Sequence, residues 1–473
     1  MAEPTVAGMQ ELAAILPPSR VSQHLADRLA YRHGTWAIEL KGLENGNLPL
    51  PAAVAWPQSA EEVQTLVDWA YRWRVPLIPY GGGSGIVGGT GSTEASLMID
   101  TKALRAVIYD TASQVVDAGA GWFGGELDAW LRDHHGVTLA HYPQSLHSST
   151  VGGWLATRAT GILSTKYGRI EDRVEGIEVV LGTGERLILG GGPPASEGPD
   201  LLRLFLGSEG RFGIITRARL RVEPGDLPEV IRVWAVRDVA SGLAVIQWLV
   251  QHGVRPTVTR LFDPEESGVW FPDLADGGAV LLLHFQGLAP IIGAEAAVAE
   301  EQARQQGARQ LPNTVGQGWW NRRFDTSALL TSLRRPGTIA ETIEVGASWT
   351  HLSQVYHAMR SALRPLCTRV YAHFSHFYAS GGSVYVIIET KAPAAEEDAV
   401  RAWYHKVLAQ ALTASLNAGG GVSHHHGIGR ARVPWLERAR PDAVQLLRTL
   451  RPVLDPHGIC NPGVLFEEGS PPA

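Results

Sequence analysis

The sequence predicts an α+β fold built in two successive parts, and three observations support this prediction. Residues 59–90 have the pattern of a helix, a short strand and a glycine-rich loop. Residues 177–189 contain two apolar runs around a Gly-Thr-Gly turn, which is typical of a β-hairpin. Beyond Pro224 the order strand, helix, strand, strand, helix occurs twice, which predicts a second part with internal pseudo-symmetry.

The elements of the first part follow from local signals. Ser59 forms a capping box with Glu62, and apolar residues then recur at helical spacing as far as Ala70. The β-rich run VPLIPY predicts the strand that leads into the glycine loop. Besides the hairpin, strands are predicted at residues 96–100, 113–121 and 212–222.

The second part is predicted as two α+β units separated by a Trp-rich link that contains Trp319 and Trp320. We expect domains at 1–224 (core about 48–224) and 225–420, and a C-terminal segment at 421–473. The first unit has strands at 230–236, 257–262 and 279–285 and helices at 240–253 and 293–308; the second has strands at 338–345, 368–374 and 383–389 and helices at 351–364 and 395–417.

Composition narrows the class of protein. The 473 residues allow two or three domains, and the net charge of −6, without a long block of either sign, argues against nucleic acid or an anionic membrane as the main partner. Only Cys367 and Cys460 are present, which is too few for a disulfide framework. The N-terminus lacks a signal-peptide pattern and the apolar runs are too short to cross a membrane, so we expect a cytoplasmic enzyme.

Seven of the eleven residues from Gly81 to Gly91 are glycine, and Gly83–Gly88 spells a G-x-G-x-x-G pattern. A Rossmann turn requires a helix to begin at the last glycines, and the Gly-Gly-Thr-Gly-Ser-Thr sequence of residues 88–93 does not favour one. The close apolar strands argue against a mere flexible linker. The remaining interpretation is a loop whose backbone N–H groups form a nest around an anion.

Three further stretches accompany this loop: PQSLHSSTVGGWLATRATG at 143–161, YGRIEDRVEGIEVV at 167–180 and LGSEGRFGIITRARL at 206–220. With the glycine loop, they resemble the FAD-binding domain of the vanillyl-alcohol oxidase superfamily, also called the PCMH type. SHHHGIG (423–429), TRLFD (259–263) and GGWLATRATG are most similar to the alkyldihydroxyacetonephosphate synthase branch and bacterial FAD-linked oxidases. The resemblance starts at about residue 45, and it implies FAD between two α+β subdomains, facing a ferredoxin-like α+β cap.

The resemblance also implies which residues bind the cofactor. Backbone N–H groups of the glycine loop would hold the FAD pyrophosphate, the 149–153 stretch would follow the ribityl chain, and the 209–214 stretch would pair with the adenine or ribose side. No histidine lies in or just after the glycine loop, so we expect non-covalent FAD. No Asp, Glu or Cys lies at ligand spacing near the three histidines at 424–426, so we expect no metal. The cofactor-binding candidates are Pro79, Tyr80, Gly81, Gly82, Gly83, Ser84, Gly85, Gly89, Pro143, Ser149, Thr150, Gly152, Gly153, Ala156, Thr157, Glu209, Gly213, Ile214, Ile215 and Asn461.

Six residues are candidates for catalysis: Tyr385, His424, His425, His426, Arg260 and Arg334. By resemblance, the histidines lie at the flavin ring, where a near-neutral pKa suits proton transfer, and the tyrosine faces the substrate. Arg260 would bind an acidic group of the substrate through its planar guanidinium, as would Arg334. The alternatives are a metal site or a structural loop for the histidines, a core aromatic role for Tyr385 and a solvated surface position for Arg334.

Departures from the branch leave two reactions open. The run YVIIE replaces an aromatic-rich strand of the synthase, and CNPGVL is closer to flavin dehydrogenases of 2-hydroxy acids. Those dehydrogenases usually carry Glu-His-Gly rather than three histidines, and a lysine where Val464 stands. We expect an FAD-dependent oxidoreductase that moves hydride from a small hydroxyl-bearing substrate to flavin N5. The alternative is a non-redox transferase of the synthase type, and a binding protein without catalysis is disfavoured; the electron acceptor and a homodimer remain open.

Overall fold

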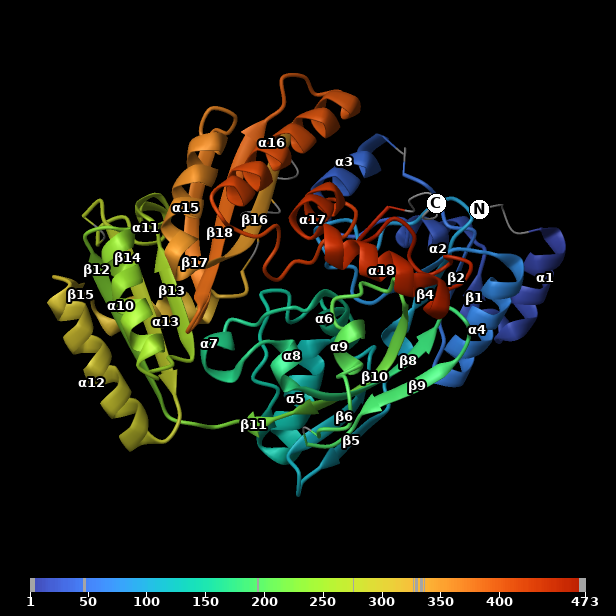
Figure 1. Cartoon of the computed structure of the whole chain (residues 1–473), viewed down its shortest axis with the longest axis horizontal. Helices are drawn as coiled ribbons and strands as arrows, with labels where there is room; N and C mark the ends of the chain where they lie inside the picture. Colours follow the sequence, from blue (N-terminus) through green and yellow to red (C-terminus); the bar gives the residue numbers. More distant parts are fainter. Residues whose placement is uncertain are drawn as a thin grey trace.

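The computed structural model describes residues 5–45, 48–193, 195–274, 276–325, 327, 331, 335 and 337–467, and the fold is α+β as predicted. Strands up to Pro224 form three sheets, and strands from Glu229 onward form a single seven-stranded sheet. Figure 1 shows the seven-stranded sheet at one end of the molecule and the other sheets at the opposite end, with the last helices lying over the latter.

The first sheet contains the strand that leads into the glycine loop. Its order is β1-β2-β4-β3, and β4 pairs in parallel with both β2 and β3. Helix α4 begins as predicted, because the Ser59 hydroxyl accepts a hydrogen bond from the Glu62 N–H at 3.3 Å. The elements are α1 (Val6–Ile15), β1 (Val21–Ser22), α2 (Leu25–Ala30), α3 (Ala37–Asn45), β2 (Ala53–Ala55), α4 (Ala60–Trp73), β3 (Leu77–Tyr80) and β4 (Leu97–Asp100).

The second sheet is antiparallel, with the order β5-β6-β10-β8-β9, and it contains the predicted hairpin as β8 and β9. A short pair, β7 with β11, closes this part of the chain. The elements are β5 (Val107–Asp110), β6 (Val115–Gly119), α5 (Gly124–His135), β7 (Val137–Thr138), α6 (Val151–Thr157), α7 (Ser164–Tyr167), α8 (Ile170–Arg173), β8 (Val174–Leu181), β9 (Arg186–Gly190), α9 (Leu202–Phe205), β10 (Gly213–Arg221) and β11 (Glu223–Pro224).

The seven-stranded sheet is made of two similar units. The first has the strand order β15-β12-β14-β13, which is the ferredoxin-like arrangement, and the second has the order β17-β18-β16. The two units join where β13 pairs with β17. The elements are β12 (Glu229–Val236), α10 (Val239–Gln251), β13 (Val258–Phe262), α11 (Pro264–Trp270), β14 (Ala279–Gln286), α12 (Ala289–Gln305), β15 (Arg309–Gln310), β16 (Thr338–Ser348), α15 (Trp349–Leu363), β17 (Arg369–Tyr378), β18 (Gly381–Lys391) and α16 (Glu397–Asn417).

One face of this sheet packs against α10, α12, α15 and α16. Strand residues such as Leu261, Ile343, Phe374 and Val384 share a hydrophobic core with these helices. Since side chains alternate along a strand, the residues next to them point to the opposite face. This opposite face carries the candidate catalytic groups.

Two segments differ from, or extend, the expected pattern. The Trp-rich link is a helix, α13 (Asn313–Arg322), in which Trp319 packs into the core of the molecule at 4 % exposure.

After α17 (Val433–Ala439) and α18 (Pro441–Leu454), the chain returns to the first sheet. There Leu77 of β3 donates to the Ile459 carbonyl at 2.7 Å and accepts from the Asn461 N–H at 2.8 Å.

Candidate active site

The glycine loop packs closely on the 145–150 loop while keeping its backbone donors available. A Cβ atom on Gly81 would lie 2.3 Å from the Thr150 hydroxyl, and one on Gly82 would lie 1.9 Å from the Ser148 carbonyl oxygen. A Cβ on Gly85, in contrast, would meet no atom within 4 Å. The backbone N–H groups of residues 82–85 donate to none of the described residues. A cradle of free N–H groups beside open space fits the phosphates of a dinucleotide.

Next to this cradle, the helix α6 presents the second group of candidates. The Thr150 hydroxyl accepts from the Gly153 N–H at 3.3 Å, and Ser149 accepts from the Trp154 indole at 2.7 Å. Thr157 donates to the Gly153 carbonyl oxygen within the helix, while Ala156 accepts from the backbone of Glu209. These bonds fix the start of α6 beside Gly81.

His141 is a buried polar group of this region that the sequence did not single out. Its ring is 1 % exposed and lies edge-on to Trp154, with 4.8 Å between ring centroids. Burial lowers its pKa to about 3, and neither ring nitrogen has a partner within the described ranges. Pro143, a cofactor candidate, lies two residues further on, in the turn that leads to α6.

Several of the remaining cofactor candidates form hydrogen bonds that connect distant segments of the chain around the glycine loop. Asn461 donates to the carbonyl oxygens of Gly89 at 2.9 Å and Glu209 at 2.7 Å. The Glu209 carboxylate accepts from the backbone N–H groups of Ile428 and Gly429 at 2.7 and 2.9 Å. The start of β10 pairs with β8 through Gly213, Ile214 and Ile215, and both isoleucine side chains are buried. Strand β3 ends with Pro79 and Tyr80, and the Tyr80 hydroxyl lies against Gly83.

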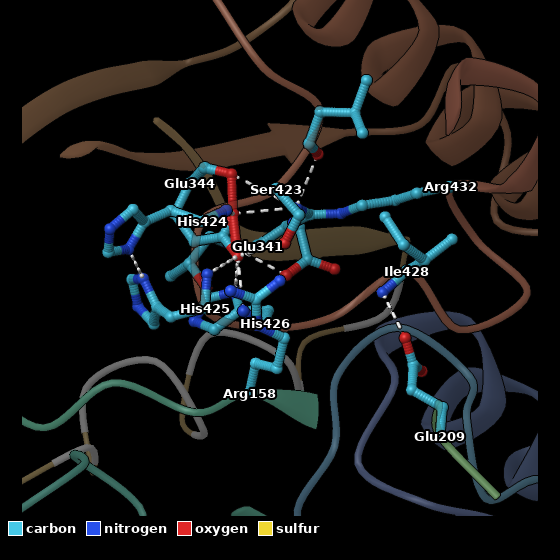
Figure 2. Close-up of polar contacts among 12 residues, drawn as sticks. Arg158, Glu209, Glu341, Glu344, Ser423, His424, His425, His426, Ile428 and Arg432 are labelled. Carbon is cyan, nitrogen blue, oxygen red and sulfur yellow. Dashed lines mark hydrogen bonds and ion pairs between the residues drawn. The ribbon is translucent and has the colours of Figure 1, made fainter. Parts of the chain in front are cut away.

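The three histidines of the SHHHGIG stretch lie in a loop that wraps around Glu344 of β16 (Figure 2). One Glu344 oxygen accepts from the N–H groups of His425 at 3.1 Å and His426 at 2.6 Å, and from the Ser423 hydroxyl at 2.9 Å. The other oxygen accepts from the His424 N–H at 3.3 Å and from Arg432 at 2.8 Å. The loop is therefore shaped by a single buried carboxylate.

Tyr385 faces this loop from the middle of a row of side chains that crosses the sheet. In the strand register Tyr385 is the partner of Glu344 on β16 and of His373 on β17. Its ring stacks on His373, with centroids 4.5 Å apart, and on His425, with centroids 5.7 Å apart. His426 meets it edge-on at 5.5 Å. The strand pairing thus brings Tyr385 and the histidines together.

Arg260 joins the same face through His373. Its guanidinium lies 3.0 Å from His373 Nδ1 and 3.9 Å from Glu266, and Glu266 lies 2.9 Å from the same ring nitrogen. The Arg260 side chain is 14 % exposed, and its buried Nε has no acceptor in the part of the chain that the structure describes. Arg260 is therefore partly balanced by Glu266 and still open to a further anion.

A second pair of histidine contacts lies behind the loop. His376 sits at an irregularity of β17 with φ +54°, where its ring stacks on His424 and its Nδ1 lies 2.8 Å from the Ser164 hydroxyl. Tyr378 places its hydroxyl 3.2 Å from His424 Nε2. Both β17 residues reach the loop from the sheet.

Burial decides the protonation states at this face. Together with the neighbouring imidazoles His376 and His426, it holds the pKa of His424 and His425 well below the usual value, and it lowers the pKa of His426 to about 4. Burial likewise raises the pKa of the Tyr385 phenol. At neutral pH the site therefore contains neutral imidazoles beside a protonated phenol.

The structure brings together Tyr385, Arg260 and the three histidines, whereas Arg334 lies outside the described residues. Sequence reasoning missed Glu344, His373, His376 and Glu266. The only available signal was a charged or imidazole side chain within an apolar strand, which needs a partner when buried. No group of three or more His, Cys, Asp or Glu residues in the described ranges is placed to hold a metal ion.

Comparison with known proteins places the chain in a family. Residues 228–465 match the family described as FAD linked oxidases, C-terminal domain, and residues 51–190 match the FAD binding domain family. The chain belongs to the FAD-linked oxidase family, as the resemblance predicted, and its cofactor is FAD. None of the helices in the described ranges is long and apolar enough to span a membrane.

Several relatives are similar over most of their length. The uncharacterized FAD-linked oxidoreductase YgcU of Escherichia coli is 28% identical, covering 89% of this chain and 90% of the relative. Alkyldihydroxyacetonephosphate synthase of Dictyostelium discoideum is also 28% identical, covering 97% and 80%. The mitochondrial D-lactate dehydrogenase [cytochrome] of Arabidopsis thaliana is 26% identical, covering 88% and 74%.

Solved structures confirm the predicted fold. An alkyldihydroxyacetonephosphate synthase aligns with a TM-score of 0.81 at 25% identity, over 98% of this chain and 87% of the other. A p-cresol methylhydroxylase with substrate bound aligns with a TM-score of 0.79 at 15% identity, over 98% and 96%. The latter likeness concerns the fold alone.

Proposed function

We propose that the protein is an FAD-dependent oxidoreductase that oxidises the hydroxyl group of a small substrate bearing an acidic group. The observation that carries this proposal is the pairing of neutral, half-buried imidazoles with the protonated phenol of Tyr385 on one face of the sheet. Instead of the near-neutral pKa expected from the sequence, burial gives these imidazoles a low pKa, so at neutral pH they are unprotonated and can accept the proton that leaves the hydroxyl group. The D-lactate dehydrogenase among the relatives supports the substrate class.

The glycine loop and α6 would hold the cofactor non-covalently. The free N–H groups of residues 82–85 would bind the pyrophosphate, and the start of α6 would lie along the ribityl chain. When bound, FAD supplies the acceptor for the hydride that leaves the substrate carbon.

The chain's own residues would bind the substrate and move its proton. Arg260 would hold the acidic group through the guanidinium surface that Glu266 leaves open. Tyr385, whose raised pKa keeps the phenol protonated, would donate a hydrogen bond to the substrate oxygen. His425 or His426 would then take the hydroxyl proton while the carbon–oxygen bond becomes a carbonyl.

A second candidate is a non-redox transferase that exchanges an acyl for a long-chain alkyl group on a dihydroxyacetone phosphate ester. It is favoured by the whole-chain similarity to alkyldihydroxyacetonephosphate synthases and by a guanidinium that also suits a phosphate. Both candidates use the same face of the sheet.

One experiment separates the two. The FAD-loaded protein is mixed anaerobically with a panel of D-2-hydroxy acids and alcohols, and the flavin absorbance near its visible maximum is followed. Bleaching that yields the matching 2-oxo acid supports the oxidoreductase. If no hydroxy acid or alcohol bleaches the flavin, but an acyl dihydroxyacetone phosphate does so without net redox turnover, the first proposal is wrong and the second is supported.

A further inference from the structure

The carboxylate of Glu344 receives more polar contacts than the ordinary needs of a buried strand residue explain. It is fully buried, and its two oxygens together accept three consecutive backbone N–H groups, a hydroxyl and a guanidinium (Figure 2). All of these donors belong to residues 423–432, while Glu344 belongs to the sheet. The carboxylate therefore connects the sheet to the loop that carries the imidazoles.

Only a carboxylate matches this set of donors. An ionised carboxylate accepts on both oxygens and offers roughly four lone-pair sites, whereas a glutamine would present an NH₂ group to half of the same N–H and guanidinium donors. Burial by itself would raise the pKa of Glu344, but Arg432 and the neighbouring histidines hold it well below the usual value. Glu344 therefore stays charged and keeps all its acceptor sites.

The register of the sheet places this connection next to Tyr385. Glu344 lies directly opposite Tyr385, so the residue that shapes the loop is the strand neighbour of the residue that faces it. Arg432 also donates to the backbone carbonyl oxygens of Glu344 and Val422, which closes the loop at both ends. The positions of the imidazoles relative to the phenol thus depend on the Glu344 carboxylate, supported by Arg432 and by Arg169, which donates to the His424 carbonyl oxygen at 2.9 Å.

We infer that Glu344 is a positioning residue: by fixing the loop of the three histidines, it holds His425 and His426 beside Tyr385, where they can take the proton of the substrate hydroxyl. This inference rests on the proposed use of the histidines as the proton acceptor. Glu344 itself contacts no substrate, because it is buried beneath the loop.

The first test measures the loop without any substrate. Hydrogen exchange with mass spectrometry is carried out on the FAD-loaded wild type and on Glu344→Gln, following a peptide that covers residues 423–429. We expect exchange in this peptide to be about tenfold faster in the variant, because charge-assisted hydrogen bonds are lost. Glu341→Gln is the matched control on the same strand, since Glu341 bonds to Thr342 and Tyr404 instead.

The second test measures the rate of flavin reduction. We expect Glu344→Gln to lower kcat by about a hundredfold with KM changed by less than about threefold, because a displaced base affects the reaction step more than binding. Glu344→Asp should recover part of the rate, and Glu341→Gln should react like the wild type. Wild-type protein that fails to oxidise any hydroxyl substrate would overturn the proposed function, whereas the exchange result would still report on the loop.

A double variant separates positioning from simple charge balance. Glu344→Gln leaves Arg432 buried without its counter-ion, so the single variant is expected to be less stable. Glu344→Gln with Arg432→Gln removes both charges and should recover the melting temperature while remaining slow. If the double variant regains the wild-type rate, or if the loop peptide exchanges as slowly in Glu344→Gln as in the wild type, the inference is wrong.

Discussion

The side-chain amide of Asn461 donates to the carbonyl oxygen of Gly89 at 2.9 Å, although the two residues are 372 positions apart in the chain. The same amide donates to the Glu209 carbonyl oxygen at 2.7 Å. Arg430 adds bonds to the Gly88 and Gly91 carbonyl oxygens at 2.8 and 3.0 Å. The C-terminal segment is thus a direct support of the glycine loop.

Replacing Asn461 by glycine tests this support. Asn461 has φ +37°, which glycine tolerates, so Asn461→Gly removes the amide without straining the backbone. We expect a loss of about 1–3 kcal/mol of stability and a roughly tenfold weaker binding of FAD. Melting temperature and FAD titration of the apoprotein would measure both effects. Asn417→Ala, at a surface contact with Arg438, is the control and should change neither.

The free space at Gly85 provides a test of the cradle. A Cβ at this position meets no protein atom within 4 Å, so Gly85→Ala should fold and melt like the wild type. If the FAD phosphates occupy this space, the methyl group should weaken FAD binding by about tenfold or more. Gly318→Ala, which also meets no atom within 4 Å, is the matched control. Equal FAD affinity in both variants would place the cofactor elsewhere.

The lowered pKa values of the histidines predict the acid side of the pH profile. Because His426 has a pKa of about 4 instead of 6.5, the base should stay neutral and the rate of flavin reduction should persist below pH 6. The unfolded chain takes up this proton below about pH 6.5, whereas the folded protein does so only near pH 4. The difference in free energy of unfolding between the wild type and His426→Gln should therefore be largest above pH 6.5 and should decrease as the pH falls toward 4. An acid limb of the rate centred at pH 6.5 would contradict the prediction.

Glu266 predicts a pH dependence of substrate binding. Burial raises its pKa to about 7, so its negative charge appears beside Arg260 as the pH rises through that value. Arg260, His373, Tyr371 and Tyr385 are titratable groups near Glu266. The KM of an acidic substrate should rise above pH 7 by about tenfold, and Glu266→Gln should remove this rise. Glu265→Gln is the control, because Glu265 pairs with Arg360 and Arg364.

Tyr385→Phe keeps the ring that stacks on His373 and His425 but removes the hydroxyl. The melting temperature should therefore change little, while kcat of hydroxyl oxidation should fall by about 10–100-fold through the lost hydrogen bond to the substrate oxygen. Stopped-flow reduction of the flavin would measure the rate. Tyr109→Phe on β5, where the ring packs against His135, serves as the control. A Tyr385→Phe variant with the wild-type kcat would leave Tyr385 without its proposed role.

The sequence predicted most elements of the fold because their signals are local. The Ser59 cap, the hairpin and both strand–helix–strand–strand–helix units depend on residues a few positions apart, and each is present in the structure. The helix in the Trp-rich link was not predicted, because the burial of Trp319 depends on segments far away in the chain.

The candidate site was predictable only in part, for a related reason. The histidines stand out as three adjacent imidazoles, but nothing local connects them to Glu344, which lies 80 residues earlier. The row of Glu344, Tyr385 and His373 arises from strand register, which depends on how three strands pair. Sequence patterns predict that strands exist, and the pairing decides which side chains meet.

The two units of the seven-stranded sheet end differently. In the first, the chain leaves α12 and adds the edge strand β15 to β12. In the second, the chain leaves α16 and reaches β16 through one backbone bond, from Gly421 to Gly346 at 2.8 Å, before turning into the histidine loop. The segment that leads into the histidine loop thus bonds to the edge of β16 that corresponds to the edge of β12 paired with β15. An edge that a strand closes in the first unit is thereby left to a loop in the second, and two side chains of this loop contact Tyr385 on the face of the sheet.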